Sequence, residues 1–240
     1  MASDPFGRAI RDHHLDVREE PLVDRDGDRT REHAIEQWYF GTRKPRDWFD
    51  DRLEGPLLDL GAGAGRDALY YQRTFETVAL EISEHLVETM RDRGVEDARQ
   101  GDMFALRETF GPDRFRSALA IGTQLGLAGS MAGIRQFLSD LAVVTTPNAT
   151  AILDNYAPEL PRTADVFAYR DDPASGLAYR VFHCEYKGEV GRTLLFRLCS
   201  LERFREAMVG TPWTVVDHSY GHPDEDPEAA TQWLTVLEKG

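Results

Sequence analysis

The sequence predicts an α/β fold in which parallel strands alternate with helices along the chain. A continuous apolar run over Leu57–Leu60 leads into a glycine-rich turn, and a helix-like segment follows from Arg66. Buried parallel strands are typically short apolar runs of this kind. A second such strand over 76–80, followed by a helix-like segment over 84–90, repeats the pattern. This repetition is typical of a doubly wound sheet, whose ligands bind outside the carboxyl ends of the strands.

The glycine-rich turn is the most specific feature of the chain. Gly61, Gly63 and Gly65 alternate behind Asp59, and glycine allows both a tight turn and close approach of the main chain to a ligand. A dinucleotide-binding fingerprint needs glycine or alanine three residues after its second glycine. Arg66 stands there instead, and its long side chain would crowd a pyrophosphate. The spacing therefore disfavours a nicotinamide-dependent oxidoreductase, which stays open as an alternative.

Acidic residues follow the next two predicted strands. Glu81 lies about twenty positions past the glycines, where a carboxylate can accept hydrogen bonds from ribose hydroxyls. Asp102 lies in the next segment, Ala98–Phe104, within Gly-Asp-Met. Carboxyl ends of parallel strands meet at one sheet edge, so we expect these acids to lie near the glycine turn.

Taken together, the glycine turn behind Asp59, Glu81 and the segment around Asp102 resemble the motifs of class I S-adenosylmethionine-dependent methyltransferases. The resemblance covers about residues 55–240 apart from an insertion, and it is specific in its first half. It implies a Rossmann-like seven-stranded sheet in the order 3-2-1-4-5-7-6, with an antiparallel last strand and helices on both faces. The remaining strands are predicted at 117–121, 149–153, 213–216 and 232–237.

The resemblance also implies S-adenosylmethionine as cofactor and a role for each motif. Asp59 would orient its methionine portion, Glu81 would bind the ribose, and Asp102 with the Met103 amide would hold the adenine. The predicted cofactor-binding set is Asp59, Gly61, Ala62, Gly63, Gly65, Glu81, Ile82, Asp102, Met103 and Ile121.

Residues that leave the fourth strand would border both cofactor and substrate. Amino-directed nucleic-acid members of the family carry an Asn/Asp-Pro-Pro-aromatic signature there, whereas this chain has Gly-Thr-Gln-Leu-Gly-Leu over 122–127. The prediction is therefore methyl transfer to a small molecule, with no catalytic residue assigned. Tyr39, Gln124 and Tyr156 are the predicted substrate residues, and Tyr39 or Trp38 could face the sulfonium. Asp154 and His183 also lie on segments predicted to face the pocket, and they are further candidates for a general base.

We predict two regions, an N-terminal segment with a cap helix over 1–50 and the methyltransferase domain over 51–240. Residues 1–30 are dense in Asp and Arg, so we expect them to be flexible or loosely packed. A helix is predicted over 33–40. Residues 157–199 form the insertion, a β-hairpin with arms at 177–186 and 193–198, and it is either a substrate lid or a homodimer surface.

Composition limits the function classes further. The 240 residues carry a net charge of −14 and only three lysines, Lys44, Lys187 and Lys239, which is typical of proteins from a high-salt cytoplasm. Nucleic acid is not an expected partner, although an RNA methyltransferase and a non-catalytic cofactor-binding partner subunit stay open as alternatives. Cys184 and Cys199 lie out of register on the hairpin arms, which favours reduced thiols and a cytoplasmic protein. The sequence shows no metal-ligand spacing, membrane span or signal peptide.

Overall fold

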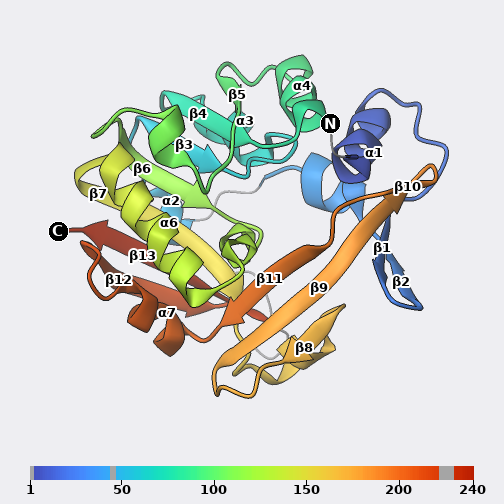
Figure 1. Ribbon diagram of the computed structural model, residues 1–240. Helices are drawn as coiled ribbons and strands as arrows, with labels where there is room; N and C mark the ends of the chain where they lie inside the picture. The colour runs from blue at the N-terminus through green and yellow to red at the C-terminus, as the bar shows by residue number, and fades with distance from the viewer. Residues whose placement is uncertain (1–2, 44–46, 222–229) are drawn as a thin grey trace.

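The computed structural model describes residues 3–43, 47–221 and 230–240. Its main feature is a seven-stranded sheet in the order β12-β13-β7-β6-β3-β4-β5 (Figure 1). The strands are β3 (Leu57–Leu60), β4 (Thr77–Glu81), β5 (Ala98–Gln100), β6 (Phe115–Ala120), β7 (Thr145–Tyr156), β12 (Trp213–Tyr220) and β13 (Gln232–Lys239). Counted from β3, this order is the predicted 3-2-1-4-5-7-6.

Strand direction also agrees with the prediction. β3 pairs in parallel with β4 and β6, while β13 runs antiparallel to both β7 and β12. All four residues of β3 and all five of β4 are buried, which explains why these strands read as continuous apolar runs. The tips of β3, β4, β6 and β7 therefore meet at one edge of the sheet.

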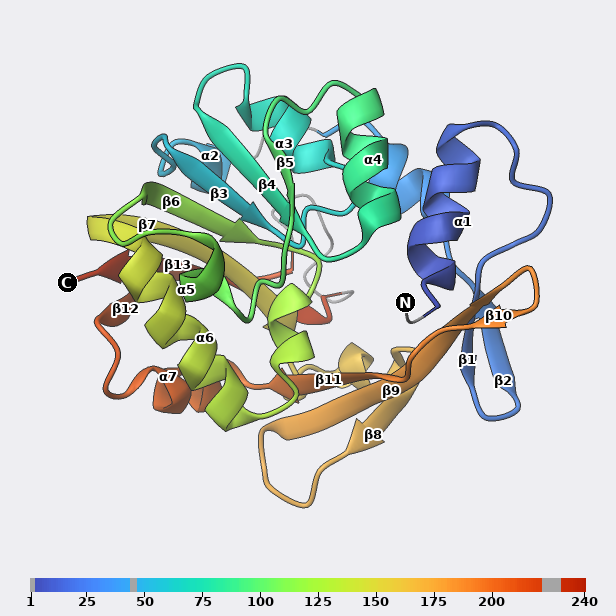
Figure 2. The same cartoon turned by 45° about the horizontal axis from the view of Figure 1, so that its top comes forward.

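Helices cover both faces of this sheet (Figure 2). They are α2 (Asp47–Asp50), α3 (Arg66–Tyr71), α4 (Glu84–Asp92), α5 (Leu106–Thr109), the 3-10 helix η2 (Gln124–Ala128), α6 (Met131–Val144) and α7 (Leu201–Met208). Ser83 and Ser200 cap α4 and α7, because each hydroxyl accepts a main-chain N–H from the first turn. The apolar face of α6, with Ile134, Phe137, Leu138 and Leu141, is buried in the largest hydrophobic cluster of the described residues, together with α5 and α7.

A second, six-stranded sheet joins the N-terminal segment to the insertion. β1 (Val23–Asp26) pairs with β2 (Arg29–Glu32) and with β9 (Leu177–Tyr186). β9 also pairs with β8 (Tyr169–Asp171), β10 (Glu189–Val190) and β11 (Leu194–Cys199). The predicted hairpin is therefore confirmed as β9 and β11, and the short 3-10 helix η3 (Pro161–Asp165) lies ahead of it.

The prediction that residues 1–30 are flexible or loosely packed is wrong for residues 3–30, and residues 1 and 2 lie outside the described residues. Asp4 caps α1 (Pro5–His14), whose Ala9 and Ile10 are fully buried, and β1 continues the second sheet. Charge density misled the prediction because the charged groups pair with one another or with the insertion. The predicted helix over 33–40 is also shorter, a π-helical turn η1 at Glu36–Phe40.

The second sheet lies against the main sheet through a separate hydrophobic cluster. This cluster contains Ile10, Leu22, Leu86, Phe182 and Leu198 among others, so it joins α1, α4, β9 and β11. Full burial of each such side chain contributes about 1.5–3 kcal/mol. The Trp233 indole donates to Cys199 O at 2.7 Å, which fixes β11 to the main sheet. The insertion is thus packed as part of the fold.

Three further features bear on the predicted properties of the chain. Cys184 and Cys199 are both buried free thiols. Within residues 3–43, 47–221 and 230–240, no helix combines the length and apolarity that crossing a membrane requires. The same ranges contain no group of three or more His, Cys, Asp and Glu side chains able to hold a metal ion.

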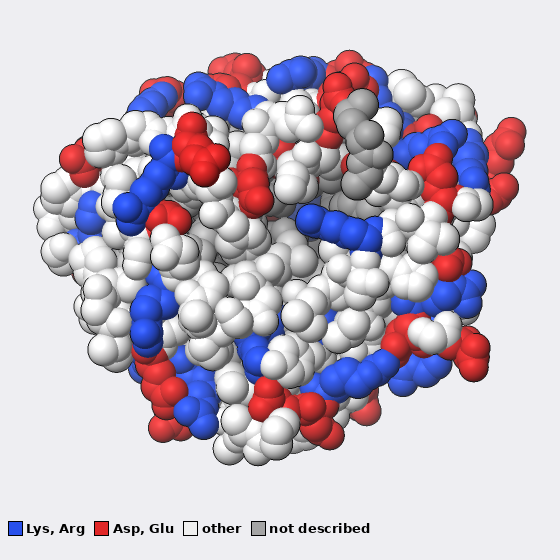
Figure 3. Space-filling view, viewed as in Figure 1, with Lys and Arg blue, Asp and Glu red and all other residues white. Residues whose placement is uncertain are grey.

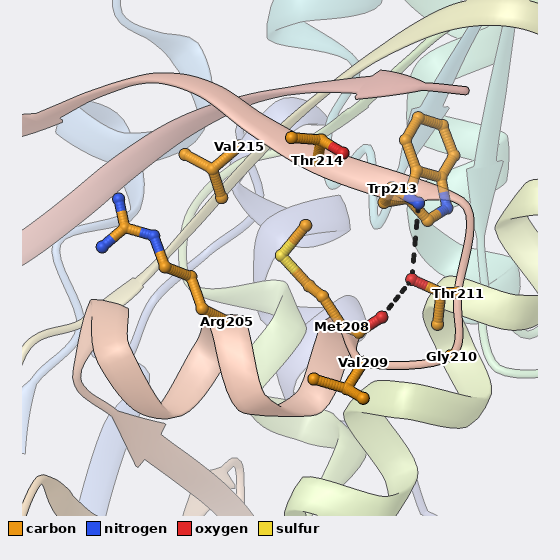
Figure 4. Close-up of a pocket in the computed structure, with 8 residues that line it drawn as sticks. All are labelled: Arg205, Met208, Val209, Gly210, Thr211, Trp213, Thr214 and Val215. Atoms are coloured by element: carbon orange, nitrogen blue, oxygen red, sulfur yellow. Dashed lines mark hydrogen bonds between the residues drawn. The ribbon is translucent and has the colours of Figure 1, made fainter.

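A surface pocket lies between α7 and the start of β12 (Figure 4). Thr211 there accepts from Trp213 N at 3.5 Å and donates to Met208 O at 2.7 Å. Trp213 pairs with Lys239 at the end of β13, whereas Tyr156 at the carboxyl end of β7 pairs with Gln232. The pocket therefore lies at the opposite edge of the sheet from the strand tips that carry the predicted site.

Candidate active site

The glycine turn after β3 adopts a backbone that other residues rarely tolerate. Gly61, Gly63 and Gly65 have φ values of +64°, +57° and +80°. A Cβ at Gly61 would come within 2.7 Å of Gln124 Oε1, and a Cβ at Gly63 would come within 3.2 Å of the Tyr39 ring. Two of the predicted substrate residues therefore lie directly over the bare main chain of the turn.

Asp59, inside β3, is a buried acid with an unfilled hydrogen-bonding site. Its side chain is 4 % exposed, and Oδ2 has no hydrogen-bond partner among the described residues. Burial, with the nearby Asp67 carboxylate, raises the pKa of Asp59 well above its usual range. Such an oxygen suits a cationic donor, because an ammonium group would both complete its hydrogen bonds and stabilise its charge.

Glu81 ends β4 and holds the glycine turn in place. Its carboxylate accepts from the main-chain N–H groups of Gly63 at 3.1 Å, Ile82 at 2.8 Å and Ser83 at 3.1 Å. Burial raises the pKa of Glu81, although these three N–H groups act to lower it. The Ile82 side chain beside it is 48 % exposed, which leaves an apolar surface next to the carboxylate.

The tip of β5 lies beside the tip of β4. Gly101 N donates to Glu81 O at 3.0 Å, so the segment after β5 leaves the sheet next to Glu81. Asp102 is exposed there, and its Oδ1 accepts from Phe104 N at 2.8 Å. Met103 is buried in the main cluster and anchors the turn. The glycine turn, Glu81 and Asp102 thus occupy three neighbouring strand tips.

The loop that follows β6 is fixed by hydrogen bonds to Asp154. Ile121 is half-buried, and Thr123 has a left-handed φ of 62°, a strained conformation for a non-glycine residue. Asp154 accepts from Gly122 N at 3.0 Å and Thr123 N at 2.6 Å. The loop that delivers Gln124 is therefore fixed by a buried carboxylate, and Asp154 has a supporting position in place of the predicted pocket-facing one.

The remaining candidate residues, His183, Tyr156 and Trp38, lie in different surroundings in the structure. His183 lies on the opposite face of β9 from the buried Cys184, and its ring bonds Glu185 at 3.1 Å, so it is not part of the site. Tyr156, at the tip of β7, packs against the second hydrophobic cluster, as Tyr39 does. Trp38 stacks edge-on against His33 and is exposed.

A buried chain of hydrogen bonds runs from the second sheet to Tyr39. Asp24 Oδ1 bonds His33 Nδ1 at 3.0 Å, and His33 Nε2 bonds Tyr39 Oη at 3.2 Å. Burial acts to raise the pKa of Asp24, but hydrogen bonds from His33 and Arg31 outweigh it and leave the pKa lowered. Burial, with Cys184, Asp24 and Glu81 nearby, raises the pKa of Tyr39, so its hydroxyl stays protonated.

Sequence reasoning missed Asp24 and His33. The one available signal was the alternation of Asp24 with Arg25, which on a strand places one side chain inside and the next outside.

The face of the molecule drawn in Figure 3, in the same view as Figure 1, is hollowed near its centre. This hollow lies between the main sheet, α1 and the second sheet.

Comparison with solved structures finds the same architecture. A S-adenosylmethionine-dependent methyltransferase from Bacteroides fragilis, solved with S-adenosyl-L-homocysteine, is similar over 99 % of this chain and 95 % of its own, at 22 % identity and a TM-score of 0.78. A 1,6-didemethyltoxoflavin-N1-methyltransferase from Burkholderia thailandensis is similar over 76 % of this chain and 70 % of its own, at 17 % identity and 0.52. The CcbJ methyltransferase from Streptomyces caelestis is similar over 77 % and 89 %, at 13 % identity and 0.58.

No family model matches the sequence, and no curated protein matches it. The structural similarities, together with the strand order, show that the chain has the Rossmann-like fold of the class I S-adenosylmethionine-dependent methyltransferases. The Bacteroides fragilis similarity extends over the N-terminal elements and the insertion as well, because it covers nearly the whole chain.

Proposed function

We propose that this protein is an S-adenosylmethionine-dependent methyltransferase that acts on a small molecule. The observation that carries the proposal is the convergence of the glycine turn, Asp59 and Glu81 on one sheet edge, with Asp59 Oδ2 left unpartnered among the described residues. The names of the similar structures add support, since one was solved with S-adenosyl-L-homocysteine and another acts on 1,6-didemethyltoxoflavin.

The site residues fit an adenosine joined to an amino acid. Asp59 would hold the ammonium group, Glu81 the ribose hydroxyls and Asp102 with the Met103 amide the adenine. Ile82 and Ile121 would pack against the adenine faces, and the main chain of Gly61, Ala62, Gly63 and Gly65 would border the ribose and the methionine portion. Two features of this chain fit such a cofactor. Oδ2 of Asp59, which has no hydrogen-bond partner among the described residues, would gain one, and the glycine turn beneath Tyr39 has no side chain to block the approach of a ligand.

The chemistry needs orientation more than acid–base catalysis. S-adenosylmethionine supplies a methyl group that its sulfonium already activates, so transfer is an in-line displacement by the acceptor. Holding two reactants in line and excluding water lowers a barrier by about 7–11 kcal/mol in well-oriented systems. Tyr39, fixed by His33 over the glycine turn, presents a ring that would attract the positive sulfur. Gln124 and Tyr156 would border the acceptor.

The insertion fits the role of a substrate wall better than that of a dimer surface. β9 and β11 pack against α1, η2 and the tip of β7, and the Asn155 amide donates to Arg197 O at 3.0 Å. We therefore place 157–199 over the acceptor side of a cytoplasmic, salt-adapted enzyme. A non-catalytic cofactor-binding subunit would share the cofactor site, and an RNA methyltransferase would need a basic surface that the net charge of −14 does not favour.

Ligand-induced stabilisation tests the cofactor class. At 100 times its Kd, S-adenosyl-L-homocysteine should add about 2.7 kcal/mol of stability, which raises Tm by about 5–10 °C in a chain of this size. NADH should produce no shift, because Arg66 occupies the position that a dinucleotide needs free. The measurement is a thermal scan in high salt with each ligand. A shift with NADH and none with S-adenosyl-L-homocysteine would reverse the assignment.

A further inference from the structure

Arg180 is a buried cation on the inner face of β9. Its side chain is 5 % exposed, and Nε donates to Phe167 O at 2.9 Å. The guanidinium carbon lies 5.0 Å from the centre of the Tyr156 ring, 4.9 Å from Phe182 and 5.5 Å from Phe196. Three aromatic rings therefore surround a charged group that is largely removed from water.

Within the part of the chain that the structure describes, no carboxylate oxygen lies within 4.0 Å of this guanidinium. Its neighbours differ in this respect: Arg197 pairs with Asp172 at 2.8 Å, and Arg31 pairs with Asp24 at 2.6 Å. Burial lowers the pKa of Arg180. The Asp24 carboxylate acts to raise that pKa but does not contact Arg180. A buried charge without an opposite charge in contact is costly, and aromatic faces with a single carbonyl offset only part of that cost.

The position of Arg180 places it on the acceptor side of the proposed active site. Tyr156, which it contacts, ends β7, and β7 lies two strands from β3 in the main sheet. Neighbouring strands are about 4.8 Å apart, so the tip of β7 is on the order of 10 Å from the glycine turn. Further along the same face of β9, Cys184 donates to Asp24 Oδ1 at 3.4 Å, beside the chain that ends at Tyr39.

We propose that Arg180 binds the carboxylate of the methyl acceptor, and that the rings of Tyr156, Phe182 and Phe196 pack against the acceptor's planar apolar part. A guanidinium forms two parallel hydrogen bonds with a carboxylate, which gives geometric specificity as well as affinity. Arg31 is already paired with Asp24, so Arg180 is left to supply one positive charge to a ligand. One positive charge matches a monoanion better than a phosphate. This inference rests on the proposed methyltransferase function, since it assigns the substrate class of the same site.

The test uses benzoate as a probe and benzamide as its neutral counterpart. Isothermal titration of the full chain, in the presence of saturating S-adenosyl-L-homocysteine, should show saturable benzoate binding with a Kd on the order of 1 mM and no benzamide binding. Arg180→Met should weaken benzoate binding at least 10-fold. Arg192→Gln removes one exposed positive charge from the same insertion and should leave the benzoate Kd within 2-fold.

Thermal scans separate ligand binding from a structural role. Replacing an unpaired buried cation by an apolar side chain of similar length should leave Tm unchanged or raise it, whereas a structural arginine would lower Tm on removal. Equal binding of benzoate and benzamide, an absence of benzoate binding, or full benzoate binding by Arg180→Met would each overturn the proposal. Displacement of benzoate by equimolar inorganic phosphate would overturn the carboxylate assignment. Failure of S-adenosyl-L-homocysteine to bind the unchanged protein would instead contradict the proposed function, whatever benzoate does.

Discussion

Glu81→Ala should weaken S-adenosyl-L-homocysteine binding at least about 100-fold. A hydrogen bond to a charged group contributes about 1.5–3 kcal/mol, and two ribose hydroxyls would lose their common acceptor. The substitution also removes the acceptor for the amides of Gly63, Ile82 and Ser83, so the glycine turn loses its anchor.

Asp102→Ala should weaken S-adenosyl-L-homocysteine binding less, by about 10-fold, because only one exposed carboxylate is lost there. Isothermal titration gives both affinities.

The matched control for Glu81 is Glu96→Ala, which removes an exposed glutamate from the loop before β5. Its affinity for S-adenosyl-L-homocysteine should equal that of the unchanged protein. Circular dichroism of Glu81→Ala should retain the folded spectrum. Unchanged cofactor affinity in both Glu81→Ala and Asp102→Ala would refute the roles assigned to these two acids.

Asp24→Asn should lower the free energy of unfolding by about 3 kcal/mol at neutral pH, and Tm by about 6–12 °C. Asp24 is fully buried and accepts hydrogen bonds from His33, Arg31 and Cys184. Since the pKa of Asp24 is lowered in the folded state, its stabilisation is present at pH values above the ordinary aspartate pKa of about 3.9. It is lost as pH falls through the lower, folded-state pKa. The two proteins should therefore converge in stability only in strong acid.

Asp28→Asn is the control for this prediction, because Asp28 is exposed in the turn between β1 and β2. It should change Tm by less than about 2 °C, the size expected of a surface substitution. Chemical denaturation at a series of pH values gives the free energies of unfolding. A pH-independent difference between Asp24→Asn and the unchanged protein would contradict the ionised, hydrogen-bonded state of Asp24.

The main sheet could be predicted from sequence because its strands are buried on both faces. Short, mostly apolar and fully buried runs at Leu57–Leu60 and Thr77–Glu81, separated by a glycine turn and a helix, leave few alternatives for their arrangement. The site residues at the ends of these strands could be predicted as well, because the carboxyl ends of parallel strands lie at the same edge of the sheet. Ser83 and Ser200, which cap α4 and α7, are signals of the same local kind, because serine is a preferred N-cap residue.

The second sheet could not be predicted in the same way. Its central contact joins Asp24 on β1 to Cys184 on β9, two residues 160 positions apart. The strands of the N-terminal hairpin carry mostly charged residues, and some of their ion pairs, such as Arg25 with Glu185, form only when the insertion is in place. Composition therefore indicated flexibility where tertiary pairing produces a strand. The hydrogen-bonded chain to Tyr39 and the buried Arg180 depend on this same pairing.

A crystal structure of the complex with S-adenosyl-L-homocysteine tests the central claim most directly. We predict the ligand's ammonium group within hydrogen-bond distance of Asp59 Oδ2, its ribose hydroxyls at Glu81, and its sulfur beneath the Tyr39 ring. Density for the ligand at another edge of the sheet, or a complex in which Asp59 and Glu81 make no contact with it, would contradict this account of the site.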